Sequence, residues 1–477
     1  MKLGIKILCF WALWLCVTSV WAGALLDTLP AASGAEQPRL PAHLPQGWRT
    51  GLVNEPVFNS RILLVEAGTG NAETVILVHG LGQNGFRDWQ QVMGQLARDY
   101  HVIALDLPGF GYSDKPPGRY SPTRYAELLS WLVAQTGQQQ VHMMGHSMGG
   151  AVALRYASNH PGRLQKLVLV SVAGVLERTA FVQHSSALPL YMDQVPGPVR
   201  HLVGDQWRQW GGKLLDLANR LPDPVALLSQ NNSAWQSLLG DSPNGNAALA
   251  LIEEDFGGTF AKVTVPTLII WGEDDPVTPV RTGQLLAGQL PHAELMVFAD
   301  TGHVPMQRLG QFNQQVSGFL SGQRSVLSGY PEITGPGDDL LCQGLSGVRY
   351  QGSYRSITIN ACTNVHLEHV RAQRIELINS EVSILNVQVR SENIALETTG
   401  SSVKATNSVF QGRQGIYAVN SRLDLAGVSL RGSQSAVVAG GEPSQFIFSV
   451  SEVIGADGAI PMHGSYRLDG NSSATQQ

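Results

Sequence analysis

Ser147 is the residue of this sequence whose surroundings most directly suggest catalysis. It lies in the pattern Gly145-His146-Ser147-Met148-Gly149, after an apolar strand at residues 141–145 and before a helical run at residues 149–159. Glycines on both sides of a serine allow a sharp, strained turn that holds the hydroxyl out of both strand and helix. A serine placed in this way is an exposed nucleophile, and it needs a base to take its proton.

The rest of the sequence offers the groups that such a serine requires. Gly80-Leu81-Gly82 follows a predicted strand in a glycine-rich turn whose backbone N–H groups can point at a ligand. Asp274 and Asp275 follow another strand, and His303 follows the last one. In chain order, these residues supply an anion-binding turn, a nucleophile, carboxylates and a base.

From about residue 57 to residue 323, the sequence resembles the capped, serine-nucleophile branch of the α/β-hydrolase superfamily. The motifs occur in that family's order of nucleophile, acid and histidine, and the glycine-rich loop at residues 106–114 is typical of the branch. The resemblance implies a catalytic triad and an oxyanion hole made by two backbone N–H groups. The triad would be Ser147, Asp275 and His303, and the N–H groups would be those of Leu81 and Met148.

The family's pattern also decides between neighbouring candidates. Its acid usually stands four residues after the tryptophan of Trp271-Gly272, which favours Asp275 over Asp274. His79 and His146 are interpreted as packing and loop-orienting groups. No cofactor is implied, and no metal site is expected because the histidines lack the spacing of metal ligands.

Among the reactions of this branch, the residues favour ester hydrolysis. A serine nucleophile argues against haloalkane and epoxide opening, for which the resemblance implies an aspartate. The loop at residues 80–85 lacks the Gly-Gly-Gly-Pro pattern of C–C bond hydrolases, and Val304 stands where many of them carry tryptophan. We therefore expect an esterase-like enzyme acting on a small-molecule ester, with C–C or other acyl hydrolysis and acyl transfer as alternatives. A non-catalytic cell-envelope binding module stays open too, because a fold does not guarantee turnover.

Strands that alternate with helices between residues 57 and 323 indicate a mostly parallel, doubly wound sheet. A Pro-punctuated helical region at about 174–260 is predicted to be an inserted cap. Residues 324–340 are rich in Ser, Gly and Pro and are predicted to be a linker. The predicted strands span residues 61–66, 74–79, 100–106, 141–145, 166–171, 267–271 and 294–298.

Short β-type runs without helices follow at residues 341–465 and predict an all-β domain. Residues 379–400, 401–420 and 421–440 form units of about 20 residues, which suit the coils of a parallel β-solenoid. An antiparallel sandwich is the alternative, and residues 466–477 are predicted to be a disordered tail. This domain is either a spacer or a contact with glycan or the cell envelope. Asparagines near strand ends are expected to form turn ladders: Asn360, Asn379, Asn386, Asn407 and Asn420.

Residues 1–22 predict export to the periplasm or the outside of the cell. Lys2 and Lys6 precede an uncharged apolar stretch, and Val20-Trp21-Ala22 offers a cleavage site ahead of Gly23. The alternative is an uncleaved anchor, in which case the chain contacts the membrane. Residues 23–56 are predicted to be an N-terminal extension that precedes the α/β domain.

The cysteines indicate the redox compartment of the protein, and the charge limits the classes of partner. Beyond the export segment only Cys342 and Cys362 remain, and an oxidising compartment permits them to form a disulfide. The formal net charge is −5, and no basic run is interleaved with aromatic residues, so a nucleic-acid partner is not expected.

Overall fold

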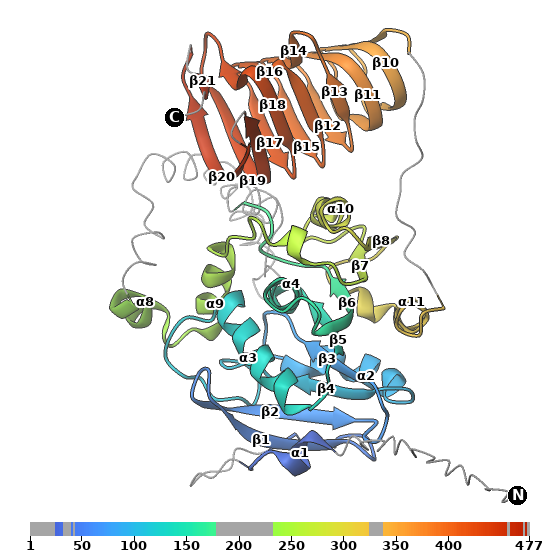
Figure 1. Ribbon diagram of the computed structural model, residues 1–477, viewed down its shortest axis with the longest axis vertical. Coiled ribbons are helices and arrows are strands. Elements are labelled where there is room, and N and C mark those ends of the chain that lie inside the picture. The colour runs from blue at the N-terminus through green and yellow to red at the C-terminus, as the bar shows by residue number, and fades with distance from the viewer. Residues whose placement is uncertain are drawn as a thin grey trace, which may run out of the picture.

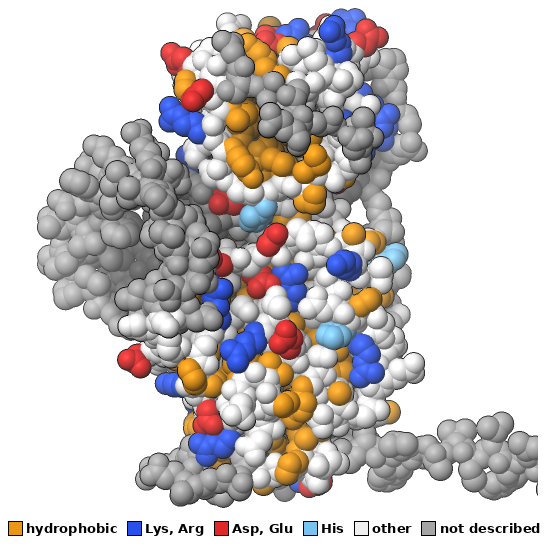
Figure 2. All heavy atoms as spheres, turned by 60° about the vertical axis from the view of Figure 1, so that its left-hand side comes forward, with side chains coloured by type: hydrophobic (Ala, Val, Ile, Leu, Met, Phe, Trp, Pro, Cys, Tyr) orange, Lys and Arg blue, Asp and Glu red, His pale blue; other side chains and the backbone are white. Residues whose placement is uncertain are grey.

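The computed structural model of the chain describes residues 24–31, 40–41, 43–177, 232–323, 337–455, 458–470 and 473–474. These residues form an α/β domain and an all-β domain that are stacked along the long axis of Figure 1. The predicted fold class is confirmed, because the first domain contains a mostly parallel sheet and the second contains mostly parallel β-strands. Acidic and basic side chains lie side by side on the face of the α/β domain shown in Figure 2.

The α/β domain is built on an eight-stranded sheet in the order β1-β2-β4-β3-β5-β6-β7-β8. Strands β4 to β8 pair in parallel, whereas β1 and β2 run antiparallel at one edge. β3 is buried along its whole length, as expected of a strand covered on both faces. The strands are β1 (Arg49–Glu55), β2 (Ser60–Ala67), β3 (Thr74–Val78), β4 (His101–Leu105), β5 (Val141–His146), β6 (Leu164–Val170), β7 (Thr267–Gly272) and β8 (Ala293–Phe298).

Helices cover both faces of this sheet with apolar side chains. One core contains residues of α3 (Pro122–Gln135), α4 (Met148–Asn159) and α10 (Val280–Gln289), and the other contains residues of α2 (Gln90–Leu96) and α11 (Leu309–Leu320). Of the predicted cap, the structure describes α8 (Asn232–Leu239), α9 (Pro243–Ile252) and η3 (Phe260–Lys262). Residues 178–231 of that cap lie outside the described residues.

The α/β domain begins earlier in the chain than the sequence indicated. β1 pairs with β2 as an edge strand, whereas the sequence predicts that residues 23–56 lie outside the α/β domain. Further upstream, α1 (Leu25–Thr28) is held by the buried carboxylate of Glu66, which accepts from the backbone N–H of Leu25 at 2.7 Å. The predicted export segment lies outside the described residues, among which no helix is long and apolar enough to cross a membrane.

The second domain stacks successive coils of a solenoid. Val382 pairs in parallel with Val403, and Val403 with Leu423, so equivalent positions recur at about 20 residues. Parallel pairing of this kind excludes the antiparallel sandwich. Its strands are β9 (Leu340–Gln343), β10 (Arg349–Asn360), β11 (Val365–Ile378), β12 (Glu381–Leu385), β13 (Gln388–Arg390), β14 (Ile394–Thr399), β15 (Ser402–Thr406), β16 (Val409–Val419), β17 (Arg422–Ala426), β18 (Ser429–Ala439), β19 (Ser444–Gly455), β20 (Gly458–Leu468) and β21 (Ser473–Ala474).

The predicted tail is shorter than expected. β20 extends to Leu468 and pairs antiparallel with β19, and β21 pairs antiparallel with β18. The residues from 466 onward therefore include ordered strand, because backbone groups at the end of the solenoid find partners in this returning chain.

At the turns of the solenoid, asparagines adopt the left-handed backbone conformation and serine side chains form hydrogen bonds between coils. Four of the five expected asparagines have left-handed backbone, with φ between 45° and 54°, whereas at the fifth position the following residue, Ala361, takes it with φ 52°. A short polar side chain tolerates this conformation better than other residues do. The hydrogen-bonded ladder, however, is made by buried serines. The hydroxyl of each serine accepts from one backbone N–H group of the preceding coil, and these serines are Ser380, Ser401, Ser421 and Ser444.

Cys342 and Cys362 form a disulfide that joins two neighbouring coils. The cross-linked cysteines are 20 residues apart, and closing a loop of this size stabilises a protein by about 3 kcal/mol through the unfolded chain. We expect Cys342→Ser/Cys362→Ser to lower the free energy of unfolding of the solenoid by about this amount in urea titrations. Reduction of the wild-type protein should reproduce the loss, and equal stability of both forms would contradict the prediction.

Candidate active site

Ser147 lies in a strained turn between β5 and α4. Its backbone has φ 53° and ψ −119°, a conformation that non-glycine residues rarely adopt. The flanking glycines make the turn feasible, because a Cβ at Gly145 would overlap the backbone of Gly149, and a Cβ at Gly149 would overlap the end of β3. The turn places Ser147 at the N-terminus of α4, where only 5 % of the residue is exposed to solvent.

The structure brings Ser147 together with Asp275 and His303, as the sequence predicted. His303 Nε2 lies 3.0 Å from Ser147 Oγ, and His303 Nδ1 lies 2.9 Å from Asp275 Oδ2. The three side chains come from segments that follow β5, β7 and β8, which lie in the same parallel part of the sheet with β6 between β5 and β7. This geometry allows the imidazole to accept the serine proton while a carboxylate faces its other nitrogen.

Asp275 is held as a carboxylate by its own loop. Its oxygens accept from the backbone N–H groups of Val277 and Thr278 at 2.8 and 2.9 Å, and from the Thr278 hydroxyl at 2.8 Å. Burial would raise the pKa of Asp275, but hydrogen bonding and charge interaction with His303, together with these amides, lower the pKa below its usual range. The neighbouring Asp274 is exposed to solvent, so of the two candidates only Asp275 contacts the histidine.

The predicted anion-binding turn lies directly against the nucleophile. A Cβ at Gly80 would stand 3.0 Å from Ser147 Cβ, which shows how closely the loop containing Leu81 approaches. Met148 is the first residue of α4, where a backbone N–H lacks an intrahelical acceptor. Within the described part of the chain, neither the Leu81 nor the Met148 N–H has a hydrogen-bond acceptor. Both are therefore available to an oxyanion formed at Ser147.

Buried polar groups fix this turn from beneath. His79 Nε2 accepts from the backbone N–H of Leu107 at 3.0 Å, so Nδ1 carries the proton and donates to the Gly80 carbonyl at 2.7 Å. Asp106 of the glycine-rich loop accepts from the backbone N–H groups of Phe86 and Tyr112 at 2.6 and 2.7 Å, which ties this loop to the segment that follows the turn. The interpretation of His79 as a loop-orienting residue agrees with these contacts.

Two contacts at the site were not evident from the sequence. Asn244, at the start of α9, accepts from the backbone N–H of Gly82 at 3.0 Å and so connects the described part of the cap to the anion-binding turn. His146 lies beside the triad, and its Nε2 is 2.9 Å from the backbone carbonyl of His303. Neither Asn244 nor His146 belongs to a sequence pattern that predicts these contacts.

His146 should make the protein sensitive to acid. Burial, and secondarily the charge of His303, lowers the pKa of His146 to about 3. In the unfolded chain a histidine takes up its proton near pH 6.5, so the unfolded state binds more protons below that pH and stability falls as the pH decreases toward 3. Between pH 7 and pH 5 we expect the free energy of unfolding of the wild type to fall by about 2 kcal/mol more than that of His146→Asn. Urea titrations at both pH values check this, and identical losses would show that His146 titrates normally.

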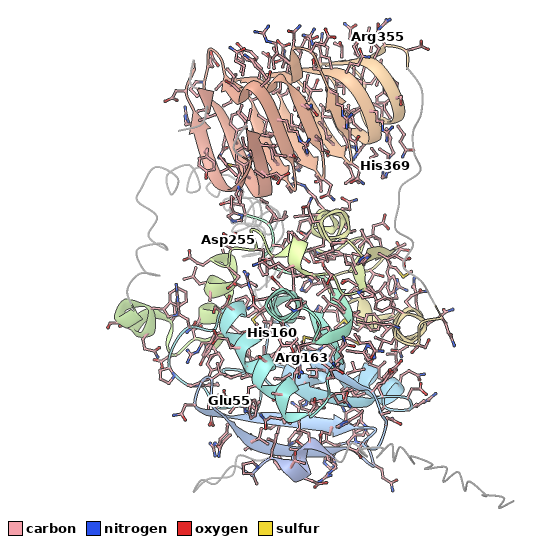
Figure 3. The ribbon with its side chains drawn as sticks, viewed as in Figure 1. Glu55, His160, Arg163, Asp255, Arg355 and His369 are labelled. Atoms are coloured by element: carbon pink, nitrogen blue, oxygen red, sulfur yellow. A yellow bond between two sulfur atoms is a disulfide. The ribbon has the colours of Figure 1, made fainter. Side chains whose placement is uncertain are left out.

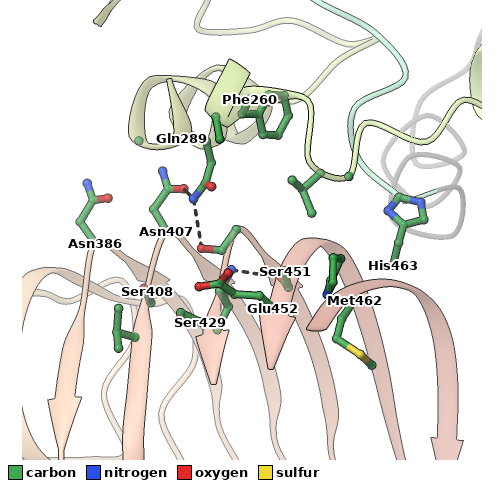
Figure 4. A pocket seen from close by; sticks show the side chains of 18 of the residues that line it. Phe260, Gln289, Asn386, Asn407, Ser408, Ser429, Ser451, Glu452, Met462 and His463 are labelled. Carbon is green, nitrogen blue, oxygen red and sulfur yellow. Dashed lines mark hydrogen bonds between the residues drawn. The ribbon is translucent and has the colours of Figure 1, made fainter. Parts of the chain in front are cut away.

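A cavity of about 990 Å³ lies between the two domains, away from the triad. Asp255 of the α/β domain and His369 of the solenoid are among its lining residues and lie on either side of the space between the domains in Figure 3. Gln289 and Asn407 are also among its lining residues, and a hydrogen bond of 3.1 Å joins their side chains (Figure 4). None of the triad residues lines this cavity, so we assign it no part in the chemistry at Ser147. Within the described residues no group of three or more His, Cys, Asp or Glu side chains could hold a metal ion.

Comparison with known proteins places this geometry in a family. A family model described as alpha/beta hydrolase fold matches residues 73–306. An uncharacterized protein of Mycobacterium bovis is 31 % identical over 263 residues, and the match covers 50 % of this chain and 72 % of the relative. The chain belongs to the α/β-hydrolase family. This α/β hydrolase is also 30 % identical to a 2-hydroxy-6-oxononadienedioate/2-hydroxy-6-oxononatrienedioate hydrolase of Paraburkholderia xenovorans over 263 residues, covering 54 % of the chain and 89 % of the relative. A solved structure described as a membrane phospholipase A is 28 % identical, covers 58 % of this chain and 86 % of its own, and has a TM-score of 0.41.

Proposed function

We propose that this α/β hydrolase cleaves carboxylic esters through an acyl-enzyme on Ser147. The observation that carries the proposal is the continuous line of contacts from Asp275 through His303 to Ser147 Oγ, at 2.9 and 3.0 Å. The backbone N–H groups of Leu81 and Met148 beside the serine, which have no acceptor among the residues that the structure describes, support it. Nucleophile, base, acid and oxyanion donors are the parts that acyl transfer to a serine requires.

The proposed mechanism follows from these positions. His303 Nε2 takes the proton of Ser147 as Oγ bonds to the ester carbonyl carbon, and Asp275 stabilises the imidazolium and holds its tautomer. The carbonyl oxygen becomes an oxyanion that accepts from the Leu81 and Met148 N–H groups, each worth about 3 kcal/mol in the transition state. The C–O bond then breaks, and His303 returns the proton to the departing alcohol. Water, deprotonated by His303, then bonds to the acyl carbon, the bond between this carbon and Ser147 Oγ breaks, and His303 returns the proton to Oγ as the acid leaves.

Cleavage of a C–C bond is the second candidate, and the named relatives favour it. Hydrolases of 2-hydroxy-6-oxononadienedioate are about as similar to this chain as the uncharacterized relatives are. Against this candidate, the loop at residues 80–85 has the sequence Gly-Leu-Gly-Gln-Asn-Gly, and Val304 follows the histidine. These two features differ from the Gly-Gly-Gly-Pro pattern of C–C bond hydrolases and from the tryptophan that many of them carry. They lie at the anion-binding turn and next to the base, so they support an ester as the substrate.

Two assays on the full chain separate the candidates. Ser147 should react with a fluorophosphonate probe, and a short p-nitrophenyl ester should be turned over with a higher kcat/KM than a 2-hydroxy-6-oxo-dienoate. A higher kcat/KM for the dienoate would identify a C–C hydrolase instead. A chain that neither reacts with the probe nor turns over either substrate would be a non-catalytic module.

We also infer that the protein is exported, and the disulfide between Cys342 and Cys362 supports this. Disulfides persist in oxidising compartments and are rare in the cytosol. In fractionated native cells, the protein should appear outside the cytoplasm with both thiols protected from alkylation. A cytoplasmic protein with two alkylated thiols would contradict the inference.

A further inference from the structure

The catalytic acid and the solenoid are connected by one short stretch of chain. Three residues after Asp275, Thr278 donates twice to the Asp275 carboxylate, through its backbone N–H and its hydroxyl. The carbonyl of Thr278 accepts from Trp271 Nε1 at 3.0 Å. α10 starts two residues later, and its second residue is Arg281. Whatever fixes the start of α10 therefore also fixes the loop that holds Asp275.

The side chain of Arg281 extends from α10 to the solenoid, and its guanidinium group forms hydrogen bonds there. Its Nε donates to Thr406 Oγ1 at 2.7 Å, and Nη1 donates to Asp424 Oδ2 at 2.7 Å. Nη2 donates to the carbonyls of Ala405 and Asp424 at 2.9 and 3.0 Å. The side chains of Arg281 and Asp424 are only 15 % and 11 % exposed, so this ion pair is shielded from solvent. A planar guanidinium that binds two neighbouring coils in this way has little freedom to move.

The rest of α10 is also held against the solenoid, beneath which it lies in Figure 1. Asn407 donates to the carbonyl of Gln284 at 2.7 Å and accepts from Gln289 Nε2 at 3.1 Å. Gly288 and Gly427 permit the close approach, because a Cβ at Gly288 would overlap the Asn407 side chain and one at Gly427 would crowd Leu285. The contact thus extends from the first turn of the helix to its last.

A second connection reaches the nucleophile. The backbone N–H of Ala173 donates to the carbonyl of Ser147 at 3.2 Å, and four residues later the backbone N–H of Glu177 donates to Ser449 Oγ of the solenoid at 2.8 Å. Ala426 and Ile447 of the solenoid belong to the same buried apolar cluster as α4 and α10. The solenoid is therefore packed against both chain segments that position the reacting groups.

We propose that the solenoid is a structural part of the active site, and that Arg281 is a positioning residue that holds the Asp275 loop through α10. This inference rests on the proposed ester hydrolysis and gives the second domain a role other than spacer or glycan contact. Since small displacements of a catalytic group lower kcat steeply, loss of the Arg281 contacts should slow the reaction without weakening substrate binding.

Arg281→Lys tests the proposal, because lysine keeps the charge beside Asp424 but cannot bind Thr406 and the two carbonyls at once. We expect kcat for a p-nitrophenyl ester to fall about 10- to 100-fold while KM changes less than about twofold, at temperatures well below unfolding. Arg355→Lys is the matched control, since Arg355 forms an exposed ion pair with Asp339 and lies on the side of the solenoid away from the α/β domain (Figure 3). Gln289→Ala weakens the contact at the other end of α10 and should leave kcat near the wild-type value.

The outcomes separate this proposal from the proposed function. Wild-type kcat in folded Arg281→Lys would overturn the positioning role, and so would an equal loss in Gln289→Ala, which would point to domain contact in general. A wild-type protein that neither hydrolyses esters nor reacts with fluorophosphonate would overturn the proposed function and this inference with it. A fall in kcat confined to Arg281→Lys supports the role of Arg281.

Discussion

Ser147→Ala should lower kcat for a short p-nitrophenyl ester by at least about 10⁴-fold and abolish labelling by fluorophosphonate. The oxygen removed is the atom that bonds to the acyl carbon, and Ser147 Oγ is the group that faces His303 Nε2 at 3.0 Å. KM should change little, because the two backbone N–H groups and the walls of the site remain. Steady-state kinetics and gel detection of the labelled chain measure the two effects.

The same variant should fold like the wild type. Alanine also has a Cβ, so the strain of the turn at φ 53° is unchanged, and only one hydrogen bond to His303 is lost. A melting temperature close to that of the wild type would show that the loss of activity is chemical. Retained turnover in Ser147→Ala would mean that another residue is the nucleophile.

The sequence alone was sufficient to predict the strands that form the middle of the sheet and the residues that meet at its edge. Runs such as β3 are apolar at every position, because helices cover both faces, and such runs are visible without knowledge of the fold. The motifs around Ser147, Asp275 and His303 each follow one of these strands, so their order along the chain was informative. The distances that join them, 2.9 and 3.0 Å, required the structure.

Features that depend on contacts between distant segments could not be predicted in this way. β1 was missed because an edge strand is only half-buried, and most of its positions lack an apolar pattern. The serine ladder was missed because serine is common in turns, and only stacking shows which hydroxyl groups are buried. The contact of Arg281 with Asp424 joins residues far apart in the sequence, and neither residue belongs to a recognisable motif.

Asp275→Asn should lower kcat by about 10⁴-fold, an effect comparable in size to the loss of the nucleophile. An asparagine fills the same space but carries no charge, and its amide can present N–H to His303 Nδ1 instead of accepting from it. The histidine would then lose the tautomer that leaves Nε2 free to take the serine proton, and the imidazolium would lose its stabilising charge. Kinetics with a p-nitrophenyl ester measure the loss, while fluorophosphonate labelling should persist at a much lower rate.

Asp274→Asn is the matched control, since it makes the same change one residue away in the same loop. Asp274 is exposed and Asp275 is only 5 % exposed, so the neighbouring substitution should leave kcat near the wild-type value. Spacing from Trp271 favoured Asp275 by analogy, whereas the contacts from Val277, Thr278 and His303 favour it by geometry. A larger loss of kcat in Asp274→Asn than in Asp275→Asn would contradict the assignment of Asp275 as the acid. In that case the acid would have to reach His303 through a different conformation of this loop, and the role of α10 in holding it would fall as well.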